Sequence, residues 1–155
     1  MSIKTFRLEQ AQLISAPRAK VFRFFSNAFN LERLTPPFLN FKILTPAPID
    51  IETNTIIDYR IKLFGIPMNW RTRILRFEPE EVFIDHQERG PYTLWHHTHT
   101  FEETEDGTLM RDIVLYKIPF GPLGLLAHSL FVRRTLERIF RYRRDALAEL
   151  MGEMA

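Results

Sequence analysis

The chain of 155 residues is 45% hydrophobic, 13% aromatic and 26% charged, with a formal net charge of +2 and no cysteine. This length and composition predict one globular domain over residues 1–155 and exclude a disordered chain. The lack of cysteine excludes disulfides, thiolate zinc sites and cysteine nucleophiles, and the balanced charge gives no indication of nucleic-acid binding.

The first part of the chain predicts one strand and then two short helices. FRLEQAQLI, residues 6–14, alternates between apolar and polar side chains as a strand does. Pro17 suits the first turn of a helix, because its missing N–H would have no partner there. NLERLT, residues 30–35, predicts a second short helix that Asn30 caps and the pair Pro36-Pro37 ends.

Residues 38–117 change to short runs with the residue preferences of strands, separated by turn residues. The runs predict about six consecutive antiparallel strands: FKIL, TIIDYRIKLF, MNWRTRILRFE, EVFIDHQ, YTLWHHTHTFEE and TLMRDIVLYKI. Gly65-Ile66-Pro67 and Gly90-Pro91 would form turns between them. Asp106-Gly107 is typical of a type I′ hairpin turn, in which both central residues have positive φ.

After Pro119 the sequence becomes helical. Apolar residues recur near the helical period and form one stripe: Val132, Leu136, Ile139, Phe140, Leu147 and Leu150. The same helix contains RRTLERIFRYRR, residues 133–144, with six arginines. We interpret these arginines as a solvated face whose stems cover apolar surface, and a site for an anionic partner is the alternative.

This order of elements predicts an α+β helix-grip fold. A curved antiparallel sheet has one concave apolar face that must be covered, and the long C-terminal helix can cover it. A wide sheet and one helix are easily left partly hollow between them, so we expect a central cavity. No run of about 18 apolar residues occurs and no signal peptide begins the chain, so we expect a cytoplasmic protein without stable membrane insertion.

Four stretches resemble the START-like, Bet v 1-like superfamily, also called the polyketide cyclase/dehydrase and lipid-transport (SRPBCC) superfamily. They are NLERLTPP (30–37), IDYRIKLFGIPMNWRTRI (57–74), FIDHQERGPYTLWHHTHTFEE (83–103) and DIVLYKIPFGPLG (112–124). They are most similar to a largely uncharacterised bacterial branch, whose domains are sometimes fused to a sugar-nucleotide-epimerase-like protein. The resemblance implies a cavity that binds hydrophobic small molecules, with catalysis in only some members, and it supplies no catalytic residues.

Strand alternation selects the side chains that would reach this cavity, because alternate residues of a strand share a face. In LWHHTHTF, residues 94–101, one face carries two large aromatic side chains together with two histidines, and we orient that face inward. The same rule applied to three strands points these side chains into the cavity: Tyr59, Trp70, Trp95, His97, His99 and Phe101.

For two strands, residues 82–88 and 108–118, the sequence pattern does not decide which face points inward. We prefer the faces that carry Asp85 and Asp112, because a carboxylate paired with histidine is easier to bury than arginine or lysine. A register slip or a bulge would invert this choice. The preferred faces add four side chains to the candidate site: Asp85, Gln87, Asp112 and Tyr116.

The two inward histidines have three interpretations. His97 and His99 could bind a metal with Asp85 or Asp112 as third ligand, but no third histidine shares their face, so we predict neither metal nor other cofactor. They could form a polar network in which histidines and carboxylates satisfy one another. They could also act as general acid and base, for which His97, His99 and Asp112 are the candidate catalytic residues.

The sequence therefore predicts a protein that binds a lipid-, polyketide- or sterol-like molecule between the sheet and the last helix. The alternative is a cofactor-free cyclase or dehydratase that acts on a polyketide-like substrate through histidine and aspartate, although nothing in the sequence requires an enzyme. A protein-interaction domain that uses the arginine-rich helix is the third hypothesis. We expect no nucleic-acid partner, and a homodimer remains open.

Overall fold

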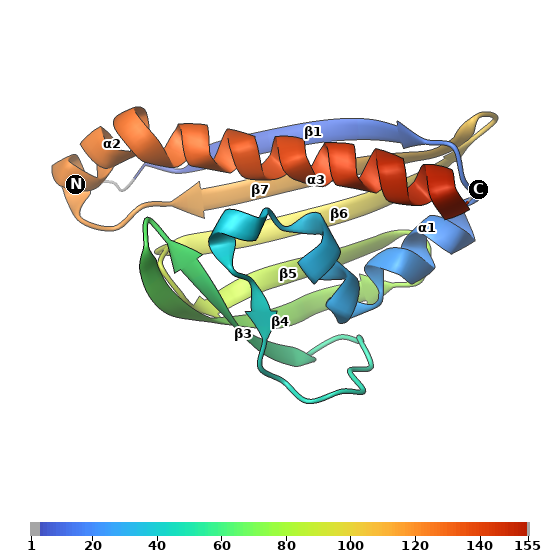
Figure 1. The fold of residues 1–155 in the computed structure, drawn as a ribbon, viewed down its shortest axis with the longest axis horizontal. Helices are drawn as coiled ribbons and strands as arrows, with labels where there is room; N and C mark the ends of the chain where they lie inside the picture. Colours follow the sequence, from blue (N-terminus) through green and yellow to red (C-terminus); the bar gives the residue numbers. More distant parts are fainter. Residues whose placement is uncertain (1–3, 155) are drawn as a thin grey trace.

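A seven-stranded antiparallel sheet curves around one long C-terminal helix (Figure 1). The structure is a computed structural model, and it describes residues 4–154. The sheet has the strand order β1-β7-β6-β5-β4-β3-β2. The strands are β1 (Phe6–Ile14), β2 (Lys42–Ile43), β3 (Ile56–Leu63), β4 (Ile66–Glu78), β5 (Val82–Arg89), β6 (Leu94–Thr104) and β7 (Gly107–Lys117). The predicted α+β helix-grip fold is confirmed.

The chain runs from β2 to β7 through neighbouring antiparallel strands, as the sequence predicts. β1 then pairs with β7 along its whole length, from Phe6 opposite Tyr116 to Ile14 opposite Thr108. The pairing of β4 with β5 shifts register at two places, after Arg71 and after Ile74. Such irregularities bend a strand, and here they help to curve the sheet toward the helix.

The turn chemistry differs from the prediction at Asp106-Gly107. Thr104 pairs with Gly107, so Glu105 and Asp106 are the central residues, and neither has a positive φ. The prediction of a type I′ turn there is therefore wrong. Gly107 has a φ of 136°, and a Cβ on it would lie 2.1 Å from the carbonyl oxygen of Ile14. This glycine is required because β1 ends against it.

Two short helical segments follow β1, as expected, and a third follows them. They are α1 (Arg18–Phe25) and the 3₁₀ helices η1 (Ala28–Leu34) and η2 (Pro37–Leu39). The predicted cap at Asn30 is wrong, because Asn27 Oδ1 accepts the cap hydrogen bond from the N–H of Phe29 at 3.1 Å. Asn30 instead donates from Nδ2 to the carbonyl of Phe24 at 2.8 Å, which ties η1 to α1.

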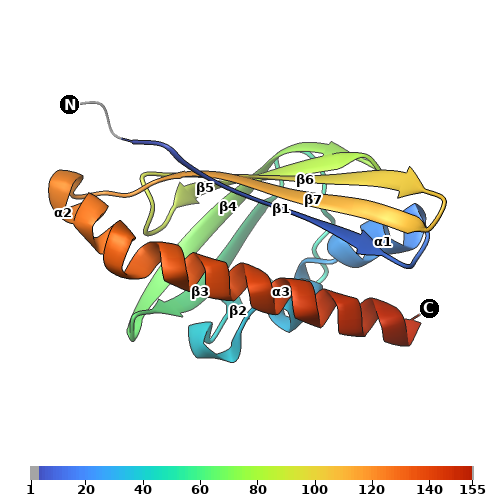
Figure 2. The ribbon, with the colours of Figure 1, turned by 90° about the horizontal axis from the view of Figure 1, so that it is seen from above.

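The C-terminal helical region has two α-helices joined by one π-helical turn. They are α2 (Gly121–Ala127), the turn η3 (His128–Val132) and α3 (Arg133–Met154). Figure 2 shows α3 lying along the sheet, while α2 turns away beyond the π-helical turn. Such a turn inserts one residue into the helix and changes its direction. No helix in residues 4–154 is both long and apolar enough to cross a membrane.

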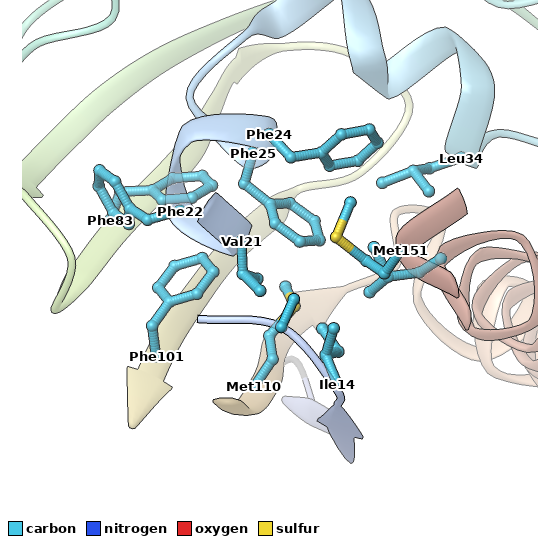
Figure 3. Packing of buried hydrophobic residues seen from close by; sticks show 12 residues of the cluster. Ile14, Val21, Phe22, Phe24, Phe25, Leu34, Phe83, Phe101, Met110 and Met151 are labelled. Atoms are coloured by element: carbon cyan, nitrogen blue, oxygen red, sulfur yellow. The ribbon is translucent and has the colours of Figure 1, made fainter. Parts of the chain in front are cut away.

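Aromatic side chains of α1 fill one end of the space between the sheet and α3 (Figure 3). Phe22 meets Phe101 of β6 edge to face with 5.1 Å between ring centroids, and Phe25 lies 5.6 Å from the same ring. Met110 of β7 and Leu147 of α3 close this cluster. Because α1 fills only this end, the middle of the concave face is left for a cavity.

Candidate functional site

β6 places two histidines between two aspartates on the concave face. In the strand register His97 lies opposite Asp85 of β5, and His99 lies opposite Asp112 of β7. The hydrogen bonds run diagonally, with 2.8 Å from His97 Nε2 to Asp112 Oδ1 and 2.6 Å from His99 Nε2 to Asp85 Oδ2. The imidazole rings stack with centroids 3.8 Å apart. The two strands whose inward face the sequence left undecided, β5 and β7, therefore both turn their aspartates toward the concave side.

Arg143 of α3 reaches the same cluster from the helix side. Its side chain is buried, and Nη2 donates to Asp112 Oδ1 at 3.3 Å. The interpretation of residues 133–144 as a solvated arginine face is wrong for this residue, whereas the other five arginines are exposed. Arg143 lies three residues after Phe140 and four before Leu147, so it occupies the apolar stripe. That position was the signal in the sequence that could have identified it.

Asp112 is the acceptor at the centre of the cluster. Oδ1 receives His97 Nε2, His99 Nδ1 at 3.1 Å and Arg143, and Oδ2 receives Gln10 Nε2 at 3.4 Å. Burial would raise the pKa of Asp112, but the charge of Arg143 and the two histidine hydrogen bonds hold this pKa well below its ordinary value. Asp112 is thus a buried anion with four donors around it.

The two histidines differ in their readiness to take a proton. Burial and the neighbouring His99 lower the pKa of His97. Burial also opposes a charge on His99, but its hydrogen bonds to Asp112 and Asp85 raise the pKa of this ring above the usual value. A neutral His97 that donates from Nε2 to ionised Asp112 has an unprotonated Nδ1. His97 can therefore act as a base or an acceptor, while His99 serves as a partner of the carboxylates.

A cavity of about 190 Å³ lies between the sheet, the segment η1–η2 and α3. Most of its wall is apolar. The charged and histidine side chains on it are four residues of the cluster, Asp85, His97, His99 and Arg143, and the other polar side chains include Asn27, Asn30, Thr35 and Thr72. Trp70 forms an aromatic wall with Tyr59, at 5.7 Å between ring centroids, and with Trp95, at 5.5 Å. Trp70 Nε1 donates to Thr72 Oγ1 at 3.1 Å, so the indole keeps its hydrogen bond without a ligand.

Six of the ten predicted contact residues line this cavity: Tyr59, Trp70, Asp85, Trp95, His97 and His99. The other four do not lie on its wall. Asp112 is behind the histidines, and Gln87 bonds to the backbone of Tyr92 at 2.7 and 3.2 Å. Phe101 packs under α1, and the hydroxyl of Tyr116 lies 2.8 Å from His128 Nε2. The alternation of side chains along the strands therefore identified the concave face of the sheet correctly. Helical segments and a loop cover the ends of that face, so the residues there do not reach the cavity.

Asp85, His97 and His99 also form a group that could hold a metal ion, since their ligand atoms lie within 4.8 Å of one another. Three of the four ring nitrogens, His97 Nε2 and both nitrogens of His99, are already paired with carboxylates, however, and Arg143 Nη2 lies 3.3 Å from His99 Nδ1. A guanidinium at this distance repels a cation. The donor set therefore fits an ion-pair network better than a zinc site.

We accordingly expect the protein to bind zinc no better than the variant His97→Ala/His99→Ala, as measured by equilibrium dialysis and elemental analysis. The matched control is His86→Ala/His96→Ala, which removes the other close histidine pair, with 5.8 Å between its rings. Stoichiometric zinc in the parent that disappears only in the first variant would contradict this prediction.

The sequence and the fold were compared with those of known proteins. The family described as polyketide cyclase/dehydrase and lipid transport matches residues 14–141. A comparison with curated protein sequences gives no match.

Solved structures share the fold at low sequence identity. A protein from Chromobacterium violaceum is 21% identical over 95% of this chain and 96% of its own, with a TM-score of 0.70. The ZhuI aromatase/cyclase from Streptomyces sp. R1128 is 14% identical over 96% and 94%, with a TM-score of 0.74. A nucleoside-diphosphate sugar epimerase from Corynebacterium glutamicum is 23% identical and has a TM-score of 0.64 over 92% of this chain, but only 28% of the epimerase is covered.

These structural likenesses support the helix-grip fold, and the match over residues 14–141 extends across most of the chain. The seven-stranded sheet around a C-terminal helix is the architecture that the resemblance implied. The chain belongs to the polyketide cyclase/dehydrase and lipid transport family.

Proposed function

We propose that the protein binds a hydrophobic or amphipathic small molecule, of lipid, polyketide or sterol type, in the cavity between the sheet and α3. The observation that carries this proposal is the cavity wall, which is mostly apolar and aromatic and has one cluster of charged and histidine side chains: Asp85, His97, His99 and Arg143. A wall of this kind suits a ligand with a large apolar body and one polar end. The family description, which includes lipid transport, supports the same class of ligand.

The polar groups suggest how such a ligand is oriented. Its apolar body would lie against Trp70 and Trp95, and its polar end would meet Asp85 and His97. The side chain of Asp85 is 19% exposed, against 6% for that of Asp112, so Asp85 is the more accessible carboxylate. Asp85 and the unprotonated Nδ1 of His97 both accept hydrogen bonds. A hydroxyl or enol group, which donates one, is therefore the polar end that fits.

Catalysis is the second candidate function, and the state of His97 is the observation that favours it. A neutral histidine whose Nε2 bonds to a buried carboxylate, and whose Nδ1 lies 3.8 Å from Asp85 Oδ2 and so beyond hydrogen-bond distance, has the arrangement of a general base. Cyclase or dehydratase chemistry would need little more than such a base and a positioned substrate. The fold shared with an aromatase/cyclase is compatible with this activity.

The variant His97→Gln separates the two functions, because glutamine keeps a hydrogen-bonding group but removes the titratable base. If the protein only binds, ligand affinity should fall about fivefold, the net value of roughly 1 kcal/mol for one hydrogen bond. If it catalyses, binding should survive while turnover falls on the order of a hundredfold or more. We expect the first result with a panel of fatty acids and aromatic polyketides.

Binding can be followed by intrinsic fluorescence, because both tryptophans of the chain, Trp70 and Trp95, line the cavity. His96→Gln is the matched control, since alternation places His96 on the opposite face of the same strand. Native mass spectrometry of the protein from its own host would identify a retained ligand. A new product that forms with the parent and not with His97→Gln would contradict the binding-only function.

A further inference from the structure

One end of the molecule carries a cluster of exposed apolar side chains. This apolar end consists of the β3–β4 turn and α2 with the following π-helical turn, which lie at the same end in Figures 1 and 2. We define it by six exposed residues: Phe64, Ile66, Phe120, Leu123, Leu126 and Phe131. Phe120 is 82% exposed and Leu123 is 75% exposed. The rings of Phe64 and Phe131 are 6.5 Å apart, so turn and helix form one continuous surface.

This surface differs from the rest of the C-terminal helical region. Residues 121–132 contain no acidic or basic side chain except His128, which is buried against Tyr116. The exposed positions of α3, in contrast, are mostly charged. A helix whose solvent-facing side is apolar indicates a surface that another phase or molecule covers.

Basic residues border the apolar end without acidic ones between them. Lys62 precedes the β3–β4 turn, Arg133 and Arg134 follow the π-helical turn, and all three are exposed. Residues 59–77 and 113–136 contain no aspartate or glutamate. The first acidic residue after this stretch is Glu137, whose carboxylate lies 4.0 Å from Arg133. The partner that complements this surface is therefore apolar at its centre and negatively charged around it.

We propose that the apolar end docks on the surface of a membrane that contains anionic lipids. Leucine and phenylalanine side chains would enter the interfacial layer, while Lys62, Arg133 and Arg134 would contact lipid phosphates. Two copies that met through this surface would bring like charges together around a two-fold axis, so charge favours a membrane over a second copy. This inference goes beyond the proposed function and does not rest on it.

A groove at the apolar end would let apolar molecules pass between the central cavity and a docked bilayer. The groove, of about 380 Å³, lies between the β3–β4 turn and α2, with Phe64, Phe120 and Leu123 on its wall. Leu63 and Tyr92 line both this groove and the central cavity. Docking would therefore bring the bilayer next to the side chains that separate the cavity from the outside.

The test is flotation with two kinds of vesicle, one of pure phosphatidylcholine and one that also contains phosphatidylserine. The parent should float with the anionic vesicles and be released at high salt, because salt screens the contacts of the exposed cations. Leu123→Glu/Leu126→Glu should lower the partition coefficient at least about tenfold, since it places two charges in the apolar layer. The matched control is Leu13→Glu/Leu75→Glu, which changes two other exposed leucines and should leave binding unchanged.

A second variant keeps the test independent of how well the first one folds. Arg133→Glu/Arg134→Glu should abolish the preference for anionic vesicles without touching the apolar residues. The proposal is overturned if the parent binds neither vesicle, or if it binds both equally well. It is also overturned if light scattering shows a dimer that Leu123→Glu/Leu126→Glu dissociates while no vesicle binding occurs. Ligand binding in the cavity is measured separately, so either proposal can fail alone.

Discussion

Replacing Asp112 by asparagine should lower the free energy of unfolding by about 3 kcal/mol or more, the cost of leaving buried charge without its partner. Asparagine has nearly the same shape, so no cavity forms. The substitution removes the negative charge that faces Arg143, and it leaves His99 Nδ1 and His97 Nε2 opposite a neutral amide. Urea unfolding at neutral pH, followed by circular dichroism, measures the loss.

The effect of this variant should depend on pH in one direction. The pKa of Asp112 in the folded protein lies well below the ordinary value of 3.8. Its stabilising contribution is therefore present above pH 3.8 and is lost as the pH falls through the lower folded value. The stability difference between the parent and Asp112→Asn should accordingly be full at neutral pH and shrink in strong acid. A difference that grew on acidification would contradict the assignment of Asp112 as a buried anion.

Asp106→Asn is the matched control, because Asp106 is exposed in the β6–β7 turn and the same change there should alter stability by less than about 0.5 kcal/mol. Arg143→Met tests the partner. In a double-mutant cycle, Asp112→Asn and Arg143→Met should cost less together than the sum of their separate effects. Additive effects would show that the two side chains do not interact, and an Asp112→Asn variant as stable as the parent would refute the cluster altogether.

The strand faces could be predicted from the sequence because alternation is a strict period of two. In β6 the two aromatic side chains set the orientation of His97 and His99, and short turns between successive strands made β5 and β7 their neighbours. The choice of face in β7 followed from the relative cost of burying Asp112 or Arg111. Such reasoning yields the sheet and one wall of the site, because both depend on local patterns.

The rest of the site depends on contacts between distant parts of the chain. Arg143 is buried where it meets Asp112, 31 residues earlier. Its place in the apolar stripe of α3 separates it from the five exposed arginines around it, but the helix sequence does not identify the carboxylate that it meets. Alternation also could not show where the cavity ends along the face. One end of the cavity is set by α1, which covers Phe101. The other end is set by the π-helical turn at His128, whose Nε2 is hydrogen-bonded to the hydroxyl of Tyr116.

Filling the cavity from its helix side should weaken ligand binding while leaving the fold intact. Ile139 of α3 lies on the cavity wall and is only partly buried, so Ile139→Trp directs an indole into empty space. A ligand would then have to displace that indole or overpack the site, at about 1–3 kcal/mol, which is roughly a 5- to 150-fold loss of affinity. Isothermal titration with the molecule identified by native mass spectrometry measures it.

Ile113→Trp is the control for Ile139→Trp, because it makes the same substitution on the outer face of β7, away from the cavity wall. It should leave affinity unchanged. If Ile139→Trp binds as tightly as the parent, the ligand does not occupy this cavity, whatever His97→Gln does. A loss in both His97→Gln and Ile139→Trp, with Ile113→Trp unaffected, would place the polar end of the ligand at His97 and its body against α3. The large effect of the tryptophan and the small effect of the glutamine are expected together, since apolar volume contributes more to such binding than one hydrogen bond.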